Sequence, residues 1–363
     1  MRKLEKRNLL HIEFMRIIAA YLVIFNHTQK KGFFLFSCFN RGSMKYWGYM
    51  SISIFCKVAV FLFLMIAGAL LLKKDIDLKT IWIKKISRMA GVLLVFSIVM
   101  YLGFGMEYGF ETYSIMDFVK KIYTNQISTI YWYLYVYIAF LMALPFLRAI
   151  VKTIKEVHYK YIFILYIVFT AIIPCVEYCL FQGNIRMYSG VSPSWLFTNI
   201  VFWPLMGYYV ENVFDIKKCT KKLLGIWGLL SLIGIGISSY LTYYMHGITG
   251  ICEEDSSQMF FATFIVFPCI MIYIGTKYYV VRHKITEFSK NIIKSIGKCS
   301  FGIYLIHILV KDLLSGLGIW KIFRKEWQLN YMFSALLFCA LTFAICYGVI
   351  FVLKKVPGLK QML

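Results

Sequence analysis

The sequence predicts an all-α integral membrane protein, a bundle of about ten transmembrane helices with both termini in the cytoplasm. Hydrophobic residues make up 60% of the 363 residues, charged residues make up only 16%, and the mean hydropathy is +0.70. Soluble domains run roughly 45–50% apolar and about 25% charged. The composition therefore excludes a soluble enzyme, a disordered chain and a disulfide-stapled secreted domain.

Ten apolar segments approach the length that a bilayer requires, which is about 20 mostly apolar residues per helix. The sixth segment is short and contains Pro204. No Pro/Ser-rich linker divides the chain, so we expect a single membrane domain over residues 1–363. The expected spans are 9–27, 52–72, 87–104, 130–150, 159–181, 197–211, 223–244, 259–280, 298–316 and 332–353.

The distribution of basic residues predicts the orientation. The termini and the loops that follow the even-numbered spans together hold 27 Lys and Arg, whereas the loops that follow the odd-numbered spans hold 11. The positive-inside rule then places both termini in the cytoplasm. The net charge of +23 is explained first by this orientation, and then by anionic lipid headgroups or by a bound polyanion resembling coenzyme A (CoA). We expect no nucleic-acid partner.

Cysteine usage predicts no metal site. Most of the ten cysteines lie inside apolar runs, where they act as small buried hydrophobes. No CxxC or Cys/His spacing typical of zinc is present.

The first segment contains two ionisable groups, Arg16 and His27, which are costly within a bilayer. At 100° per residue, their separation of eleven positions leaves the two side chains only about 20° apart in angle and roughly 16 Å apart along the axis. They therefore share a helix face. A structural interpretation stays open, in which Arg16 pairs with Glu13 and His27 merely caps the outer end.

The ninth segment carries a second polar stripe, because steps of four and three residues place Ser300, Tyr304 and His307 on one face, and Lys311 continues it. Two intramembrane histidines on two polar stripes indicate a shared polar cavity between the helices. Other candidate residues have ordinary explanations by themselves. Lys57 lies near the start of the second span, ahead of its apolar run. Trp132 and Tyr133 are typical of the aromatic belt at a membrane interface. The basic residues Lys84, Lys85 and Arg88 are explained by the positive charge expected on the cytoplasmic side.

Taken in order, these pieces resemble the acyltransferase 3 family of multipass membrane acyltransferases, over nearly the whole chain. Two departures indicate a divergent branch similar to O-acetyltransferases of surface polysaccharides. The family's Ser-Gly is Ala67-Gly68 here, and its Arg-x-x-Arg is Lys85-x-x-Arg88. The matching pieces are the Arg16-to-His27 signature, the Phe-rich stretch 60–68, the basic entry to the third span, Trp132-Tyr133-Leu134 with Pro145, Gly207-Tyr208-Tyr209 and the stretch 300–307.

The resemblance implies transfer of an acyl group, expected to be acetyl, from cytoplasmic acyl-CoA to a hydroxyl of a cell-surface glycan or its lipid-linked precursor. Acyl-CoA is then a co-substrate, and no cofactor is permanently bound. His27 is expected to be the general base, and neutral imidazole suits that task. Arg16 would orient the thioester or stabilise charge. Lys84, Lys85 and Arg88 would bind the CoA phosphates, and Lys57, Trp132, Tyr133, Ser300, Tyr304 and His307 would line the substrate site.

Direct transfer and a covalent acyl-histidine relay both fit the sequence. A transporter or flippase of a glycan precursor or a small amino acid also fits ten helices with a polar centre. A structural subunit of a polysaccharide-synthesis complex explains the hydrophobicity but not the intramembrane His and Arg. The high Tyr, Phe, Ile and Lys content is typical of AT-rich bacterial genomes, so we expect a bacterial plasma membrane.

Overall fold

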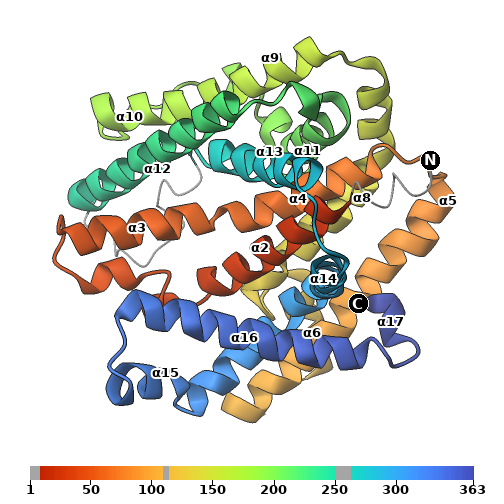
Figure 1. Cartoon of the computed structure of the whole chain (residues 1–363), viewed down its shortest axis with the longest axis vertical. Coiled ribbons are helices and arrows are strands. Elements are labelled where there is room, and N and C mark those ends of the chain that lie inside the picture. The colour runs from red at the N-terminus through yellow and green to blue at the C-terminus, as the bar shows by residue number, and fades with distance from the viewer. Residues whose placement is uncertain (1–8, 109–113, 250–262) are drawn as a thin grey trace.

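The computed structural model describes residues 9–108, 114–249 and 263–363, and these residues form helices and loops without any strand (Figure 1). The first half contains α2 (Leu10–Asn26), α3 (Met44–Cys56), α4 (Val58–Leu71), α5 (Leu78–Thr80), α6 (Ser87–Tyr108), α7 (Ile115–Tyr123), α8 (Trp132–Thr153), α9 (Glu156–Ile167) and α10 (Ile173–Phe181). The second half contains α11 (Phe202–Tyr208), α12 (Lys221–Thr249), α13 (Val266–Arg282), α14 (Glu287–Gly316), α15 (Ile319–Lys321), α16 (Tyr331–Leu353) and α17 (Leu359–Met362).

Short segments of wider or tighter winding extend these helices. The π-helical ones are η3 (Ile81–Ile86), η5 (Val168–Ile172), η8 (Tyr209–Val213) and η12 (Ile322–Glu326). The 3₁₀ turns η1 (Gln29–Lys31) and η2 (Leu35–Cys38) follow α2. As a result, η3 joins α5 to α6 and η5 joins α9 to α10 in single long helical rods.

Seven helical rods in the described part of the chain are long and apolar enough to cross a membrane, which confirms the all-α membrane fold. Each of the ten predicted segments overlaps a helix, but α2 and α13 have only 17 residues each and α11 is shorter still. Ten crossings and cytoplasmic termini stay predictions, and positions 259–262 of the eighth segment lie outside the described residues. The seven rods are Met44–Leu71, Leu78–Gly103, Thr129–Thr153, Glu156–Phe181, Lys221–Gly247, Glu287–Gly316 and Tyr331–Leu353.

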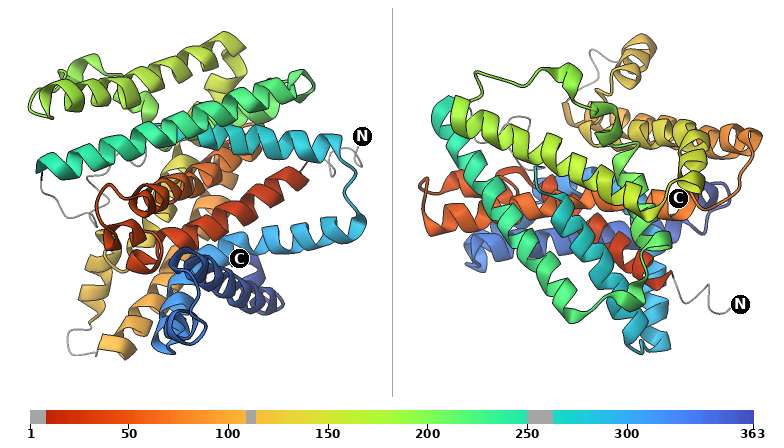
Figure 2. Two further views of the ribbon diagram at one scale, coloured as in Figure 1. Left: turned by 60° about the vertical axis from the view of Figure 1, so that its left-hand side comes forward. Right: turned by 90° about the horizontal axis from the view of Figure 1, so that it is seen from above.

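The helices stack in layers. Figure 1 shows α9, α10 and α12 along one side and α16 along the opposite side, with α2, α3 and α4 between them. The turned view in Figure 2 keeps this order. The central position of α2 explains why its residues at both ends contact other helices.

Two glycines allow α4 and α11 to cross with their backbones in contact. A methyl group added at Gly68 would lie 2.0 Å from the Pro204 carbonyl oxygen, and one at Gly207 would lie 1.9 Å from that of Met65. Small residues at such crossings let membrane helices approach closely. This crossing fixes the position of α4.

A third glycine brings α14 against α2. A methyl group at Gly297 would lie 2.4 Å from the Glu13 carboxylate and 2.9 Å from the Glu13 carbonyl oxygen. The two helices run in the same direction, because His307 of α14 meets His27 at the far end of α2. The packing therefore brings together the two polar stripes that the sequence contains.

Candidate active site

His27 and His307 form a contact pair where the far ends of α2 and α14 converge. The His307 Nε2 atom lies 3.3 Å from His27 Nδ1, and the ring centroids are 5.1 Å apart. His307 is fully buried, whereas His27 is half-buried and is the C-cap residue of α2. The His27 ring is therefore the more accessible of the two.

The backbone fixes the tautomer of both rings. His27 Nδ1 lies 2.8 Å from the Val23 carbonyl oxygen, and His307 Nδ1 lies 2.7 Å from that of Tyr304. Because a carbonyl only accepts hydrogen bonds, both Nδ1 atoms carry the hydrogen in the neutral rings. The single hydrogen on His27 Nδ1 is then shared between the Val23 carbonyl oxygen and the more distant His307 Nε2. This leaves His27 Nε2 with a free lone pair, the property that a general base needs.

Two tyrosines, Tyr133 and Tyr304, lie next to the histidine pair and form what we call the tyrosine layer. Tyr304 is almost fully buried, its ring centroid is 6.0 Å from that of His307, and its hydroxyl donates to the Ile130 carbonyl. The Tyr133 ring meets the Tyr304 ring edge-on at 5.5 Å between centroids. Tyr304 thus lies next to both His307 and Tyr133.

A cavity of about 390 Å³ begins at this tyrosine layer. Of the predicted site residues, it brings together Arg16, Arg88, Tyr133, Ser300 and Tyr304. Neither histidine lines it. The remaining wall is mostly apolar and comprises Phe63, Ile66, Ala67, Leu70, Leu71, Met89, Tyr137, Gly297, Phe301 and Leu363, with Lys74 and Lys298 adding positive charge.

The end of the cavity away from the histidines is basic. Arg16 pairs with Glu13 at 2.9 Å, as the structural interpretation of the sequence expected, and it also lines the cavity. Arg88 donates to the Met362 carbonyl oxygen at 3.3 Å, so α17 packs beside this end. With Lys74 and Lys298, the wall carries four basic side chains.

The other predicted site residues lie outside the cavity wall. Lys84 is exposed and Lys85 half-buried on η3, one turn or less before Arg88. Trp132 begins α8 and packs half-buried against the core. Lys57 sits at the junction of α3 and α4, with its ammonium 4.5 Å from the Phe33 ring centroid.

The loop before η3 is anchored by a helix cap. The Asp77 carboxylate accepts from the Thr80 backbone N–H at 2.9 Å. Hydrogen bonds from the side chain and backbone of Thr80 lower the pKa of Asp77, which keeps the cap ionised. The cap thereby fixes the start of the helix that carries Lys84, Lys85 and Arg88.

Sequence reasoning missed Lys74 and Lys298 as cavity residues and Lys311 as a neighbour of His27. The Lys311 ammonium donates to the His27 carbonyl oxygen at 3.2 Å. Lys74 and Lys298 were counted only as loop or span-end charge, whereas Lys311 was expected to continue the polar stripe of the ninth segment. Lys298 did carry a usable signal, because it lies on α14, which also holds Ser300, Tyr304 and His307.

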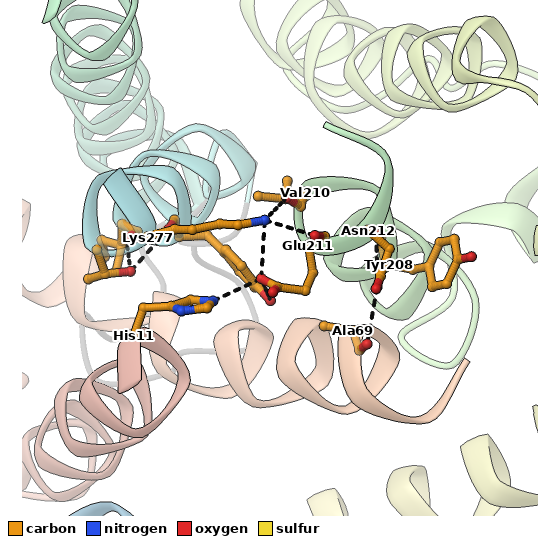
Figure 3. Close-up of polar contacts among 10 residues, drawn as sticks. His11, Ala69, Tyr208, Val210, Glu211, Asn212 and Lys277 are labelled. Carbon is orange, nitrogen blue, oxygen red and sulfur yellow. Dashed lines mark hydrogen bonds and ion pairs between the residues drawn. The ribbon is translucent and has the colours of Figure 1, made fainter. Parts of the chain in front are cut away.

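A second buried polar cluster, also missed, ties α2, η8 and α13 together (Figure 3). The Glu211 carboxylate lies 2.8 Å from His11 Nε2 and 3.4 Å from the Lys277 ammonium, and it accepts from the Tyr273 hydroxyl at 3.3 Å. Lys277 also donates to the carbonyls of Val210 and Glu211, which the π-helical winding leaves available. The neighbouring Asn212 donates to the Ala69 carbonyl, so the cluster holds the end of α4 at the cavity wall.

Comparison with known proteins agrees with this architecture. The family model described as an acyltransferase domain matches residues 9–351, nearly the whole chain. No curated protein and no solved structure matches the chain. The match runs from the start of α2 into the last turn of α16, and so includes both histidines and the whole cavity wall except Leu363. The chain therefore belongs to the acyltransferase 3 family, the membrane acyltransferases that its sequence motifs resemble.

Proposed function

We propose that this membrane acyltransferase moves an acetyl group from cytoplasmic acetyl-CoA to a hydroxyl of a cell-surface glycan or its lipid-linked precursor. One observation carries the proposal. A histidine with a free Nε2 lone pair stands beside a tyrosine layer, and a cavity with a basic far end begins on the other side of that layer.

His27 Nε2 takes the proton of the acceptor hydroxyl as its oxygen attacks the thioester carbonyl. The tetrahedral intermediate then collapses, the carbon–sulfur bond breaks, and the imidazolium returns the proton to the leaving CoA thiolate. His307 Nε2 holds the His27 Nδ1–H during both steps, so the same nitrogen remains the base.

The basic end of the cavity suits the CoA phosphates. Arg88, Lys74 and Lys298 supply positive charge there, and Lys84 and Lys85 extend it along η3. Arg16, held by Glu13, also lines the cavity and would orient the thioester. The apolar wall suits the pantetheine arm, because a dry passage protects a thioester from water.

The acetyl group must pass the pair formed by Tyr133 and Tyr304 to reach His27. Lys57 and Trp132 lie outside the cavity wall, and under this proposal they belong to the acceptor side. We place the acceptor at the half-buried face of His27, in the outer half of the membrane, and the donor in the cytoplasm of a bacterial cell.

Inverted membrane vesicles supplied with radiolabelled acetyl-CoA test the proposal. We expect label in the glycan fraction from vesicles that contain the protein and none from vesicles that lack it. Uptake of a solute without any labelled glycan would instead support a transporter and would contradict the acyltransferase proposal.

A further inference from the structure

The tyrosine layer belongs to a larger group of aromatic side chains around the cavity, which we call the aromatic collar. The collar consists of Phe63 from α4, Tyr133 and Tyr137 from α8 and Tyr304 from α14, and all four residues line the cavity. Tyr133 is its central member. The centroid of the Tyr133 ring lies 6.1 Å from that of Phe63, 6.1 Å from that of Tyr137 and 5.5 Å from that of Tyr304. These are contact distances for aromatic pairs.

The order of residues along the helices places the collar away from the basic end of the cavity. Phe63 precedes Lys74 by eleven residues, and Tyr304 follows Lys298 by six residues, roughly 9 Å along the axis of α14. In acyl-CoA, the phosphates and the acyl group lie at opposite ends of the pantetheine arm. A donor whose phosphates lie at the basic end therefore presents its acyl group to the collar.

Hydrogen bonds fix the Tyr304 side of the collar. The Tyr304 hydroxyl donates to the Ile130 carbonyl in the turn before α8. The next residue in that turn, Tyr131, is buried, and its hydroxyl lies 3.3 Å from the Phe96 carbonyl oxygen and 3.4 Å from that of Leu305. Because these contacts tie the turn to both α6 and α14, Tyr304 is held in its place in the collar.

The backbone of α4 fixes the Phe63 side. Five residues after Phe63, the crossing at Gly68 leaves no room for even a methyl group against the Pro204 carbonyl oxygen. The crossing holds α4 in place, and Phe63 with it. Tyr133 contacts both fixed sides through its ring, so the volume of that ring decides how wide the passage between them can open.

Ring contact between Tyr133 and Tyr304 leaves no open passage for a carbon chain between them. An acyl group that approaches His27 must therefore displace the Tyr133 ring, and every added methylene enlarges that displacement. Close-packed interiors yield little to added volume. A misfit of one methylene in an apolar site changes a rate by about tenfold or more.

We propose that the aromatic collar restricts the donor to acyl groups of two or three carbons, and that Tyr133 determines this specificity. The inference rests on the proposed function and names the class of its donor. Tyr133 takes no part in bond making or breaking. A longer acyl-CoA still binds through its phosphates, but its thioester carbonyl stops short of His27 Nε2. The discrimination therefore lies in kcat, with the donor KM nearly unchanged.

A series of acyl-CoA donors tests the inference. Inverted vesicles that contain the protein are supplied with acetyl-, propionyl-, butyryl- or hexanoyl-CoA, and the acyl groups on the glycan are identified and quantified by mass spectrometry. Relative to acetyl transfer, we expect propionyl transfer to be about tenfold slower, butyryl transfer about a hundredfold slower and hexanoyl transfer undetectable. Butyryl transfer at the acetyl rate would overturn the inference and leave the proposed function intact.

The absence of transfer from every donor would instead overturn the proposed function, and the inference with it. The two failures are therefore distinguishable.

Substitutions test whether Tyr133 itself is responsible. Tyr133→Ala opens the collar, so the ratio of butyryl to acetyl transfer should rise about tenfold or more, whereas Tyr133→Phe keeps the ring and should keep the wild-type ratio. Tyr135→Ala, two residues away on α8 and outside the cavity wall, is the matched control and should also keep it. The ratio is formed within each preparation, so a loss of folded protein does not change it.

If Tyr133→Ala abolishes all transfer, Tyr133→Leu, which removes less volume, supplies the same measurement. A butyryl-to-acetyl ratio that stays at the wild-type value when the ring is removed would overturn the assignment of specificity to Tyr133.

Discussion

The chemistry of the site depends on the protonation of single atoms. Val23 and Tyr304 hold the Nδ1 atoms of His27 and His307 as donors, and His307 Nε2 in turn accepts from His27. Residue types and helical spacing were enough to single out both histidines in the sequence. Their direct contact was not predictable, because it depends on how closely two helices approach.

His307→Ala tests the role of the second ring. Loss of the second acceptor for His27 Nδ1–H leaves His27 in place, held by the Val23 carbonyl, but less firmly oriented, so we expect transfer to slow about 10–100-fold. The measurement is the initial rate of labelled acetyl transfer at equal protein level in the membrane. A rate equal to that of the wild type would show that His307 serves packing alone.

Lys74→Gln and Lys298→Gln test the basic end of the cavity. Each removes one positive charge from the cavity wall, so we expect the acetyl-CoA KM to rise about tenfold with kcat nearly unchanged. Lys73→Gln, an exposed neighbour outside that wall, is the control and should not change KM. An acetyl-CoA KM that stays constant in all three variants would place CoA elsewhere.

At the scale of elements, apolar runs predicted helices well and their irregularities poorly. The second predicted span is broken at Lys57 into α3 and α4, and α3 begins at Met44, well before the predicted start. The π-helical segments were not predicted, since wider winding leaves little trace in a short apolar run. The glycine crossing of α4 and α11 was equally hidden, because each glycine matters only against its partner helix.

Gly68→Ala tests that crossing. The added methyl group meets the backbone of Pro204, which cannot move aside as a side chain could, so we expect a loss of about 1–3 kcal/mol of stability. The thermal midpoint of the detergent-solubilised protein should fall. Gly228→Ala in α12 is the control, because nothing lies within 4 Å of the added atom. Equal midpoints for both variants would contradict the close crossing.

At the scale of the whole molecule, the fold places the basic end of the cavity and the histidine pair at opposite ends of α2. The basic cavity end lies near the start of α2, the histidine pair lies at its far end, and Tyr133 and Tyr304 stand between them. Composition predicted the membrane fold, and the motifs predicted the family. The cavity wall could not be read from the sequence, because it draws on α2, α4, α6, α8, α14 and Leu363 at once.

The central claim is that His27 performs the transfer but does not bind the donor. A single-turnover measurement with His27→Ala, saturated with labelled acetyl-CoA in inverted vesicles, tests it most directly. We expect acetyl-CoA to bind with the wild-type Kd, since His27 does not line the cavity, and no label to reach the glycan. Transfer of label at the wild-type rate would contradict the account.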